Sequence, residues 1–395
     1  MIDFKSSRKW SFPLNIILFN ACKLYPFRNK HLWVFGAREG HQYDDNSRFL
    51  FEYVNKNKKN IHAVWLTRHK EIAALIQKEG FEAYTIGSWK GISMALKAGV
   101  SFYTNGLIDF GTFPLVGGST VVALWHGMGF KKIYNGKYHG IALIVKKILD
   151  KFFFSWTYRN VTISTSQYAN QWLAEMFTLN PKKIFITGQP RNDAFKELNR
   201  TGILKRIGIN SQKKIILYLP TYRQSNLGIN AMKNIILNLY ENEPLNMALK
   251  NSDSIFITKP HPLTPHIELS NRENFKILDY ASVENNQELL GIADILVTDY
   301  SSCFIDYAIL NRPIIFYVPD EKEFIEKSED LEDYYFKIER VCRTTTPEEL
   351  ALQLANPASN VSDATNKLFC DDGIKGTCYS ENVFNVVFKE VGIVI

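Results

Sequence analysis

The chain has 395 residues, of which 46% are apolar and 22% charged, and its formal net charge is +7. This length is greater than one hydrophobic core usually supports, so it predicts two domains. The modest positive charge favours an anionic substrate or membrane surface over nucleic acid. The five cysteines form no CxxC pair and no metal-type spacing with histidine, so we expect reduced thiols in a cytosolic protein.

An apolar run at residues 10–21 follows several basic residues and imitates a signal peptide. Pro13, Asn15 and Asn20 interrupt the run, which is too short to span a bilayer. Further basic residues follow it. We therefore predict that residues 1–30 form an amphipathic segment that lies on a membrane, with a core helix or a cleaved signal as alternatives. A second basic and apolar stretch, residues 141–159, could lie on a surface or form a core helix.

Along the rest of the chain, short β-rich runs alternate with helical patterns, which predicts an α/β fold with parallel sheets. In the first half, the predicted strands lie within 31–37, 61–67, 81–87, 100–106, 119–127 and 160–166, and the predicted helices are 46–57, 70–80 and 89–99. In the second half, the predicted strands with their following turns are 183–193, 213–223, 253–262, 275–280, 293–302 and 312–320.

This doubling predicts two similar domains that meet near residues 180–190. We expect a first domain over residues 31–182 and a second domain over 183–363. The last stretch, 364–395, has a helical pattern and is expected to pack back towards the first domain.

Polar side chains follow most of these strands. Ligands of open α/β sheets bind at the carboxyl ends of the strands, so these side chains are candidates for a common site. They are His126, Arg191, Asn192, Arg223, Lys259, His261, Asp299, Ser301 and Ser302.

Each cluster has a chemical and a plain structural interpretation. Ser301 and Ser302 open a predicted helix and could bind an anion, or could simply cap it. The planar fork of Arg223 suits a phosphate. Lys259 and His261 lie on a turn stiffened by prolines, where His261 could donate to a phosphate or a leaving-group oxygen, or where the turn is only a surface feature.

His126 ends the apolar run 121–125 and is followed by Gly127 and Gly129, which allow close backbone approach. It is either a catalytic base or a structural histidine. The nearby Lys131 and Lys132 raise the local positive field, although they could equally face a membrane or water.

Two further clusters are ambiguous. Arg191 and Asn192 could contribute to a site or form caps and salt links of an interdomain turn. Residues 44–46, downstream of Arg38, open a predicted helix with Asn46 or Ser47 as a plausible N-cap, and could also touch an acceptor. The chain contains no Walker A loop, no GxGxxG fingerprint, no GxSxG elbow and no convincing DxD metal pair.

An ordered set of motifs resembles the CDP-glycerol glycerophosphotransferase family, the transferases that build or prime polyol-phosphate chains of teichoic acids and some capsules. The motifs are WHGMGFKKI, TGQPRNDAF, ILYLPTYR, TKPHP and ADILVTDYSSCFIDYAILNRPIIFYVPD. The resemblance extends over residues 31–385. It implies a GT-B-like architecture of two Rossmann-type domains facing a cleft, with the nucleotide donor held mainly by the second.

The resemblance also implies roles for individual residues. His126 would be the general base for the acceptor hydroxyl, and His261 would bind or protonate the departing phosphate. The donor-binding residues implied by it are Arg191, Asn192, Arg223, Lys259, Asp299, Ser301 and Ser302, with Asp299 more readily orienting its turn than touching the donor.

The expected reaction is transfer of a polyol phosphate, foremost glycerol phosphate, from a CDP-activated donor to a hydroxyl of a lipid-linked or polymeric acceptor, with release of CMP. No metal or other cofactor and no nucleic-acid partner are expected. The resemblance places such an enzyme peripherally on the cytoplasmic face of the bacterial membrane. The alternatives are a GT-B glycosyltransferase or an epimerase that uses a nucleotide sugar, and a non-catalytic membrane-binding protein.

Overall fold

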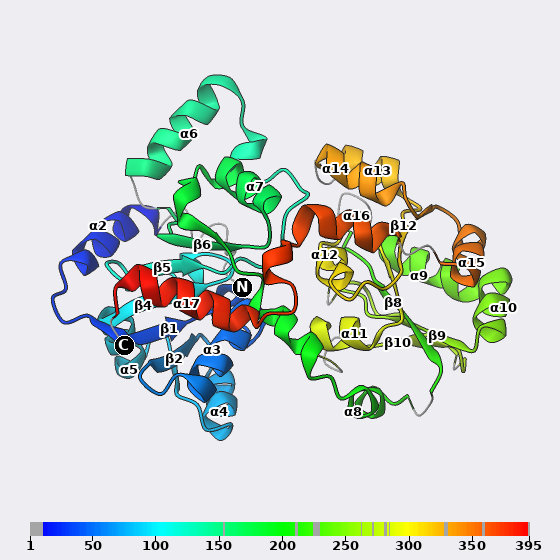
Figure 1. Ribbon diagram of the computed structural model, residues 1–395, viewed down its shortest axis with the longest axis horizontal. Coiled ribbons are helices and arrows are strands. Elements are labelled where there is room, and N and C mark those ends of the chain that lie inside the picture. The colour runs from blue at the N-terminus through cyan, green and yellow to red at the C-terminus, as the bar shows by residue number, and fades with distance from the viewer. Residues whose placement is uncertain are drawn as a thin grey trace. The chain divides into compact units, whose positions relative to one another are not determined.

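The computed structural model describes residues 11–152, 155–209, 212–223, 230–261, 263–270, 272–279, 283, 285–327, 331–357 and 360–393. Internal contacts divide the chain into two units. The first contains the described residues up to His126, residues 133–193 and those from Asp371 onward, and the second contains Gly127–Lys132 and Ala194–Cys370. In each unit, helices cover a parallel sheet (Figure 1).

The first unit contains a seven-stranded sheet in the order β3-β2-β1-β4-β5-β6-β7. Its strands are β1 (Asn29–Phe35), β2 (His62–Thr67), β3 (Ala83–Thr85), β4 (Ala98–Tyr103), β5 (Thr120–Ala123), β6 (Val161–Ser164) and β7 (Ile184–Ile186). Its helices are α2 (Phe12–Lys23), α3 (Asp45–Asn57), α4 (Lys70–Lys78), α5 (Trp89–Lys97), α6 (Gly140–Phe152), α7 (Gln167–Phe177) and α17 (Tyr379–Val391). The strand order reverses between β1 and β4, the switch point at which doubly wound sheets bind ligands.

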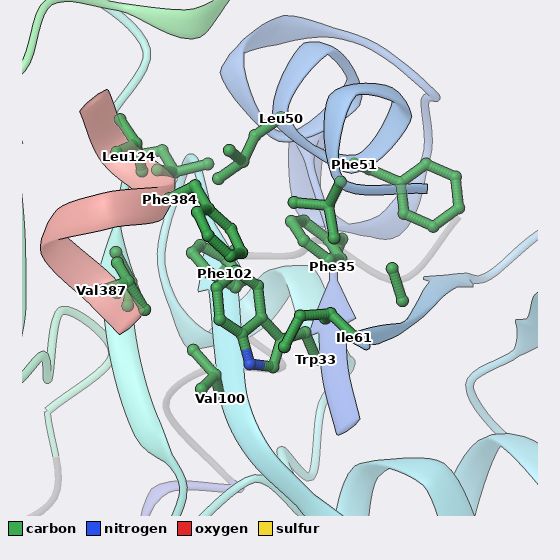
Figure 2. Close-up of a cluster of buried hydrophobic side chains, with 14 of the residues drawn as sticks. Trp33, Phe35, Leu50, Phe51, Ile61, Val100, Phe102, Leu124, Phe384 and Val387 are labelled. Carbon is green, nitrogen blue, oxygen red and sulfur yellow. The ribbon is translucent and has the colours of Figure 1, made fainter. Parts of the chain in front are cut away.

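Alternate residues of the strands enter opposite cores because successive strand side chains point to opposite faces. Trp33 and Phe35 face α3 and α17, whereas Leu32 and Val34 face α2 and α5. Figure 2 shows the first of these cores.

The C-terminal helix α17 completes the first unit. Phe384 and Val387 enter the same core as Trp33, with the Trp33 and Phe384 ring centroids 5.3 Å apart (Figure 2). The helix start is held by Asp193, whose carboxylate accepts the backbone N–H groups of Tyr379 and Ser380, each at 2.8 Å. The preceding helix α16 (Asn360–Phe369) packs instead on the second unit.

The second unit repeats the same topology in a six-stranded sheet, ordered β10-β9-β8-β11-β12-β13. Its strands are β8 (Lys214–Leu219), β9 (Ser254–Thr258), β10 (Phe275–Ile277), β11 (Ile295–Thr298), β12 (Ile314–Tyr317) and β13 (Arg343–Thr344). Its helices, besides α16, are α8 (Arg200–Arg206), α9 (Ala231–Glu241), α10 (Glu243–Asn251), α11 (Asn286–Ile292), α12 (Cys303–Ala308), α13 (Glu321–Lys327), α14 (Asp333–Glu339) and α15 (Pro347–Ala355). Here the order reverses between β8 and β11.

The boundary between the sheets differs from the one expected at residue 183. Strand β7 pairs with β6 as the edge of the first sheet, with Ile163 opposite Phe185. Residues 184–193 therefore continue the first unit. The apolar pattern of β7 gave no indication of its sheet, because a pattern specifies a buried strand and not its neighbour.

The expected elements are present. Most strands are shorter than predicted, because residues at the ends of the predicted ranges lie in turns, whereas β1 and β4 each begin two residues earlier than predicted. Helix α3 begins one residue earlier than expected, with Asp44 rather than Asn46 or Ser47 in the cap position. Residues 364–395 contain the end of α16 and all of α17.

Helix α2 has both a packed and an exposed side. Phe19 lies in the core, and a Cβ on Gly117 would lie 2.1 Å from the Phe19 carbonyl oxygen, so the helix backbone contacts this turn directly. Leu14 and Ile17 point outward and are 44% and 66% exposed. The first ten residues of the predicted membrane segment lie outside the described residues.

Candidate active site

His126 lies just beyond the carboxyl end of β5, next to the switch point of the first sheet. Its ring Nδ1 lies 3.0 Å from the carbonyl oxygen of Thr104, which follows the neighbouring strand β4. A carbonyl oxygen only accepts, so Nδ1 carries the proton of the neutral ring and Nε2 carries the lone pair. Nε2 has no hydrogen-bond partner within the described residues. This is the tautomer that a general base at Nε2 requires.

A buried carboxylate and two arginines surround this histidine. Asp45, at the start of α3, forms ion pairs of 2.8 Å with Arg38 and with Arg191. The same Nη1 of Arg191 also donates to the carbonyl oxygen of His126 at 2.8 Å. Asn46 donates to the Trp125 carbonyl oxygen at 2.9 Å. The turn that carries His126 is therefore held from both sides.

The electrostatic surroundings keep His126 neutral. Burial, assisted by the Arg38 guanidinium, lowers the pKa of His126 to about 4, although Asp45 and the Thr104 carbonyl act in the opposite direction. Asp45 has a pKa lowered to about 2, because the two arginines outweigh its burial. At neutral pH the imidazole is therefore uncharged and the carboxylate beside it is ionised.

Backbone strain is concentrated in the same place. Arg38, Glu39, Asp45 and Trp125 have φ values of 47°, 60°, 63° and 55°, in the left-handed region that L-residues seldom adopt. Such conformations persist where the surrounding structure enforces them, and they gather at functional sites.

In the second unit, Arg223 occupies the centre of an ionic cluster. Its guanidinium pairs with Asp299 at 2.9 Å and with Asp320 at 2.6 Å, and donates to the Thr221 carbonyl oxygen at 2.8 Å. The side chain is 1% exposed. Carboxylates of its own unit therefore occupy the guanidinium fork that the sequence motif assigns to donor phosphate.

Asp299 is likewise held by hydrogen bonds within its own unit. Its Oδ1 accepts the Thr221 N–H at 2.8 Å, and its carbonyl oxygen accepts the Tyr335 hydroxyl at 3.1 Å. Ser301 and Ser302 follow it and are half-buried immediately before α12. The predicted positions of all three at the end of a strand are therefore observed, with Asp299 orienting the turn.

The glycine-rich segment after His126 belongs to the second unit. A Cβ on Gly127 would lie 2.8 Å from Ser302 Oγ, so only glycine allows this approach without a shift. The Phe130 carbonyl oxygen accepts the Glu332 N–H at 2.7 Å. The Phe130 ring stacks on the Tyr335 ring with centroids 4.9 Å apart. Lys131 forms an antiparallel bridge with Leu331.

The TKPHP turn after β9 places its two candidate residues, Lys259 and His261, in different environments. Lys259 is buried, and its Nζ contacts the Val283 carbonyl oxygen and Asn286 Oδ1, the latter at 2.8 Å, so it braces the start of α11. His261 is exposed, and its Nδ1 accepts the Leu263 N–H at 3.2 Å. Its Nε2 therefore carries the ring proton when neutral and is a donor, the opposite tautomer to His126.

Arg191 and Asn192 were expected on the donor side, but both lie in the first unit. Arg191 contacts Asp45 and His126, and both residues are buried. The reason is the pairing of β7 with β6, which keeps the following turn with the first sheet.

Several site residues were not identified from the sequence. Thr104 and Asp109 follow β4, and Asp320 follows β12. All three follow a strand, as His126 does. They were missed because Thr104 and Asp320 fall inside the ranges predicted as strands, 100–106 and 312–320, and Asp109 lies three residues beyond the first of these ranges. Only the fold pairs Thr104 with His126 and Asp320 with Arg223.

No group of three or more His, Cys, Asp or Glu side chains in the described ranges is arranged to hold a metal ion. The helices of the same ranges are all too short or too polar to cross a membrane.

Comparison with known proteins gives consistent results. The family described as CDP-glycerol:poly(glycerophosphate) glycerophosphotransferase matches residues 18–372. A teichoic acid poly(glycerol phosphate) polymerase of Bacillus spizizenii is 31% identical over 339 residues, 82% of each chain. A teichoic acid glycerol-phosphate transferase of Staphylococcus aureus is 26% identical over 323 residues, 78% of each chain. A second polymerase, from Bacillus subtilis, is 26% identical over 94% of this chain, which spans only 50% of that relative.

Solved structures share the fold. The wall teichoic acid polymerase TagF superposes with a TM-score of 0.73 at 22% identity, covering 97% of each chain. A complex of Staphylococcus aureus MnaA with UDP gives a TM-score of 0.55 at 11% identity, covering 93% of this chain and 98% of the other. The predicted α/β, GT-B-like fold class is confirmed.

The matched family is a family of transferases, which confirms the predicted enzyme class over the nucleotide-sugar alternatives. The match extends through both sheets and includes every candidate residue from His126 to Ser302. The chain therefore belongs to the CDP-glycerol:poly(glycerophosphate) glycerophosphotransferase family.

Proposed function

We propose that this protein transfers glycerol phosphate from CDP-glycerol to a hydroxyl group at the end of a lipid-linked or polymeric teichoic-acid acceptor and releases CMP. The single observation that carries the proposal is the 3.0 Å contact between His126 Nδ1 and the carbonyl oxygen of Thr104. This contact places the ring proton on Nδ1 and the lone pair on Nε2, beyond the carboxyl end of β5 and next to the switch point of the first sheet. The family and its teichoic-acid relatives supply the identity of the donor and the type of acceptor.

In this proposal, His126 is the general base. Its Nε2 takes the proton from the acceptor hydroxyl as that oxygen forms a bond to the β-phosphorus of the donor. The bond from this phosphorus to the bridging oxygen breaks, and the bridging oxygen leaves with CMP. Asp45 stabilises the imidazolium that forms, because its pKa of about 2 keeps it ionised beside the ring.

The second unit is proposed to bind the donor. The hydroxyl groups of Ser301 and Ser302 and the Nε2–H of His261 are the donors that we assign to its phosphates and to the leaving oxygen. Phosphoryl transfer depends mainly on positioning and on charge stabilisation, which such donors provide. Arg223 and Lys259 are assigned a positioning role, because their cationic groups contact carboxylates or carbonyl oxygens of their own unit.

A panel of activated donors tests the proposed reaction. The purified chain is incubated with a synthetic lipid-linked glycerol phosphate acceptor and CDP-glycerol, CDP-ribitol or a UDP-sugar. We expect CMP release and a product heavier by one or more glycerol phosphate units with CDP-glycerol. UDP release from a UDP-sugar, with no reaction of either CDP donor, would contradict the proposal. Mass analysis also distinguishes addition of one unit from polymerisation.

We further propose that the first unit associates with the cytoplasmic face of the membrane, where a lipid-linked acceptor is accessible. Helix α2 exposes Leu14 and Ile17, and helix α6 exposes Ile141, Ile144 and Ile148. These apolar side chains share their helices with lysines, which is typical of helices that lie in an anionic lipid interface.

Introduction of negative charge on the exposed apolar faces of these helices tests membrane binding. We expect Ile17→Glu combined with Ile144→Glu to reduce co-sedimentation with phosphatidylglycerol vesicles by about tenfold or more, since two buried apolar contacts are lost. Leu352→Glu is a matched control, because Leu352 is 74% exposed on α15 of the second unit. Equal sedimentation of both variants and the wild type would exclude these helices as the membrane contact.

A further inference from the structure

Asp109 is a buried carboxylate at which two turns of the first unit meet. It lies in a short 3₁₀ turn, Leu107–Phe110, and is fully buried. Its Oδ1 accepts the Glu39 N–H at 2.7 Å, and its Oδ2 accepts the N–H groups of Thr104 and Asn105 at 2.8 and 3.0 Å. Three peptide donors thus converge on one carboxylate.

One of these donors belongs to the peptide unit that also contacts His126. The Asn105 N–H and the Thr104 carbonyl are the two ends of a single peptide group. That group donates to Asp109 at one end and accepts from His126 Nδ1 at the other, at 3.0 Å. A continuous hydrogen-bonded chain therefore runs from the Asp109 carboxylate through one peptide to the imidazole.

The second turn gives Asp109 another route to the site. The Glu39 N–H that Asp109 accepts is adjacent to Arg38, and Arg38 pairs with Asp45. Arg38 and Glu39 both have positive φ values. The backbone packs tightly here, since a Cβ on Gly36 would lie 3.0 Å from the Asp109 carbonyl oxygen. The turn at Glu39 and the turn at Thr104–Asn105 therefore both donate hydrogen bonds to the same carboxylate.

A carboxylate that only caps a turn needs one or two backbone N–H contacts, and any peptide of the turn can supply them. Asp109 instead contacts the particular peptide whose carbonyl oxygen binds His126. The carboxylate polarises the Thr104–Asn105 peptide, and hydrogen bonds in series strengthen one another in a buried environment. A polarised carbonyl oxygen is a better acceptor for the Nδ1 proton. It favours the Nδ1–H tautomer and stabilises the imidazolium that forms when Nε2 takes a proton.

We propose that Asp109 is the positioning acid of His126, acting through the Thr104–Asn105 peptide instead of by direct contact. This inference rests on the proposed role of His126 as the base. It assigns Asp109 the function of holding the imidazole tautomer and orientation, and no contact with the donor or acceptor.

The variant Asp109→Asn tests the proposal with two measurements. Turnover with CDP-glycerol is expected to fall about 10- to 100-fold, by analogy with the loss of an outer hydrogen-bond partner of a metal-binding histidine. The KM for CDP-glycerol is expected to stay unchanged. Imidazole ¹⁵N NMR at pH 7 should detect Nδ1–H at His126 in the wild type and a shift towards Nε2–H in the variant.

A matched variant separates this role from general stabilisation. Asp294→Asn removes a carboxylate that likewise accepts a backbone N–H, that of Ile215 at 2.7 Å, but lies in the second unit. It should leave the His126 tautomer unchanged. An unchanged tautomer in Asp109→Asn, or Nε2–H at His126 in the wild type, would overturn the proposal, and the wild-type measurement stands even if the variant fails to fold. Because the NMR measurement needs no substrate, failure of the base assignment is detected separately.

Discussion

Replacement of His126 by alanine is expected to reduce turnover with CDP-glycerol by about 100-fold or more, the usual effect of removing a general base. The acceptor hydroxyl would lose the group that takes its proton, while the donor would still bind the second unit. We therefore expect kcat to fall and the KM for CDP-glycerol to remain similar. CMP release under saturating donor measures the effect.

His31→Ala is the matched control for this substitution. The His31 Nδ1 also lies 3.0 Å from a backbone carbonyl oxygen, that of Asn60, but His31 is exposed and lies near the amino end of β1, at the edge of the sheet opposite to the strand ends that carry the site. Its replacement should leave CMP release unchanged. Near-normal CMP release by His126→Ala would remove His126 from the base role.

The pH profile of the wild type provides a second check on the same residue. Because burial lowers the pKa of His126 to about 4, the free enzyme keeps a neutral base at every pH well above this value. Protonation of His126 itself should then reduce kcat/KM near pH 4 instead of near 6.5, the usual pKa of histidine. Burial raises the pKa of Asp109 to about 6, so protonation of that positioning carboxylate should add a separate, partial fall near pH 6. In Asp109→Asn the fall near pH 6 should disappear, and a fall near pH 6.5 that persists in this variant would show that another group controls the acid limb.

Replacement of Arg223 by alanine is expected to destabilise the second unit by about 3–5 kcal/mol, the cost of leaving a buried charge without its partner. Asp299 and Asp320 would both lose their cation, and Asp299 is fully buried. The guanidinium also lies 5.1 Å from the centroids of the Tyr300 and Phe324 rings, so packing would be lost as well. Thermal and urea unfolding measure this loss.

Arg200→Ala is the appropriate control, since Arg200 pairs with Asp294 at 2.9 Å but both side chains are about one third exposed. Its loss should cost about 1 kcal/mol or less. If Arg223→Ala kept wild-type stability and lost only donor affinity, Arg223 would be a phosphate ligand, as the sequence motif implies, and the positioning role would be excluded.

Much of the fold was accessible from the sequence because it depends on local patterns. Runs such as Val121–Trp125 are apolar on both strand faces, as parallel strands covered by helices must be. The alternation of these runs with helices predicted two α/β domains. The position of His126 at a strand end followed from the same patterns.

The assignment of strands to sheets was less accessible. Strand β7 has the same apolar pattern as its neighbours, yet it pairs with β6 and takes Arg191 into the first unit. Residues 127–132 leave the first unit immediately after His126 and pack against Glu332 and Tyr335. Such choices are made by long-range packing, which a local pattern does not encode.

The sequence by itself determined the fold class, the family and the candidate residues at strand ends, because periodicity and ordered motifs are local properties. Only the tertiary structure decided what those residues contact. It placed the Thr104 carbonyl against Nδ1 of His126 and the carboxylates of Asp299 and Asp320 around Arg223. The physical reason is that tautomer, charge pairing and pKa depend on partners remote in sequence, which parallel strands bring together at one edge of a sheet.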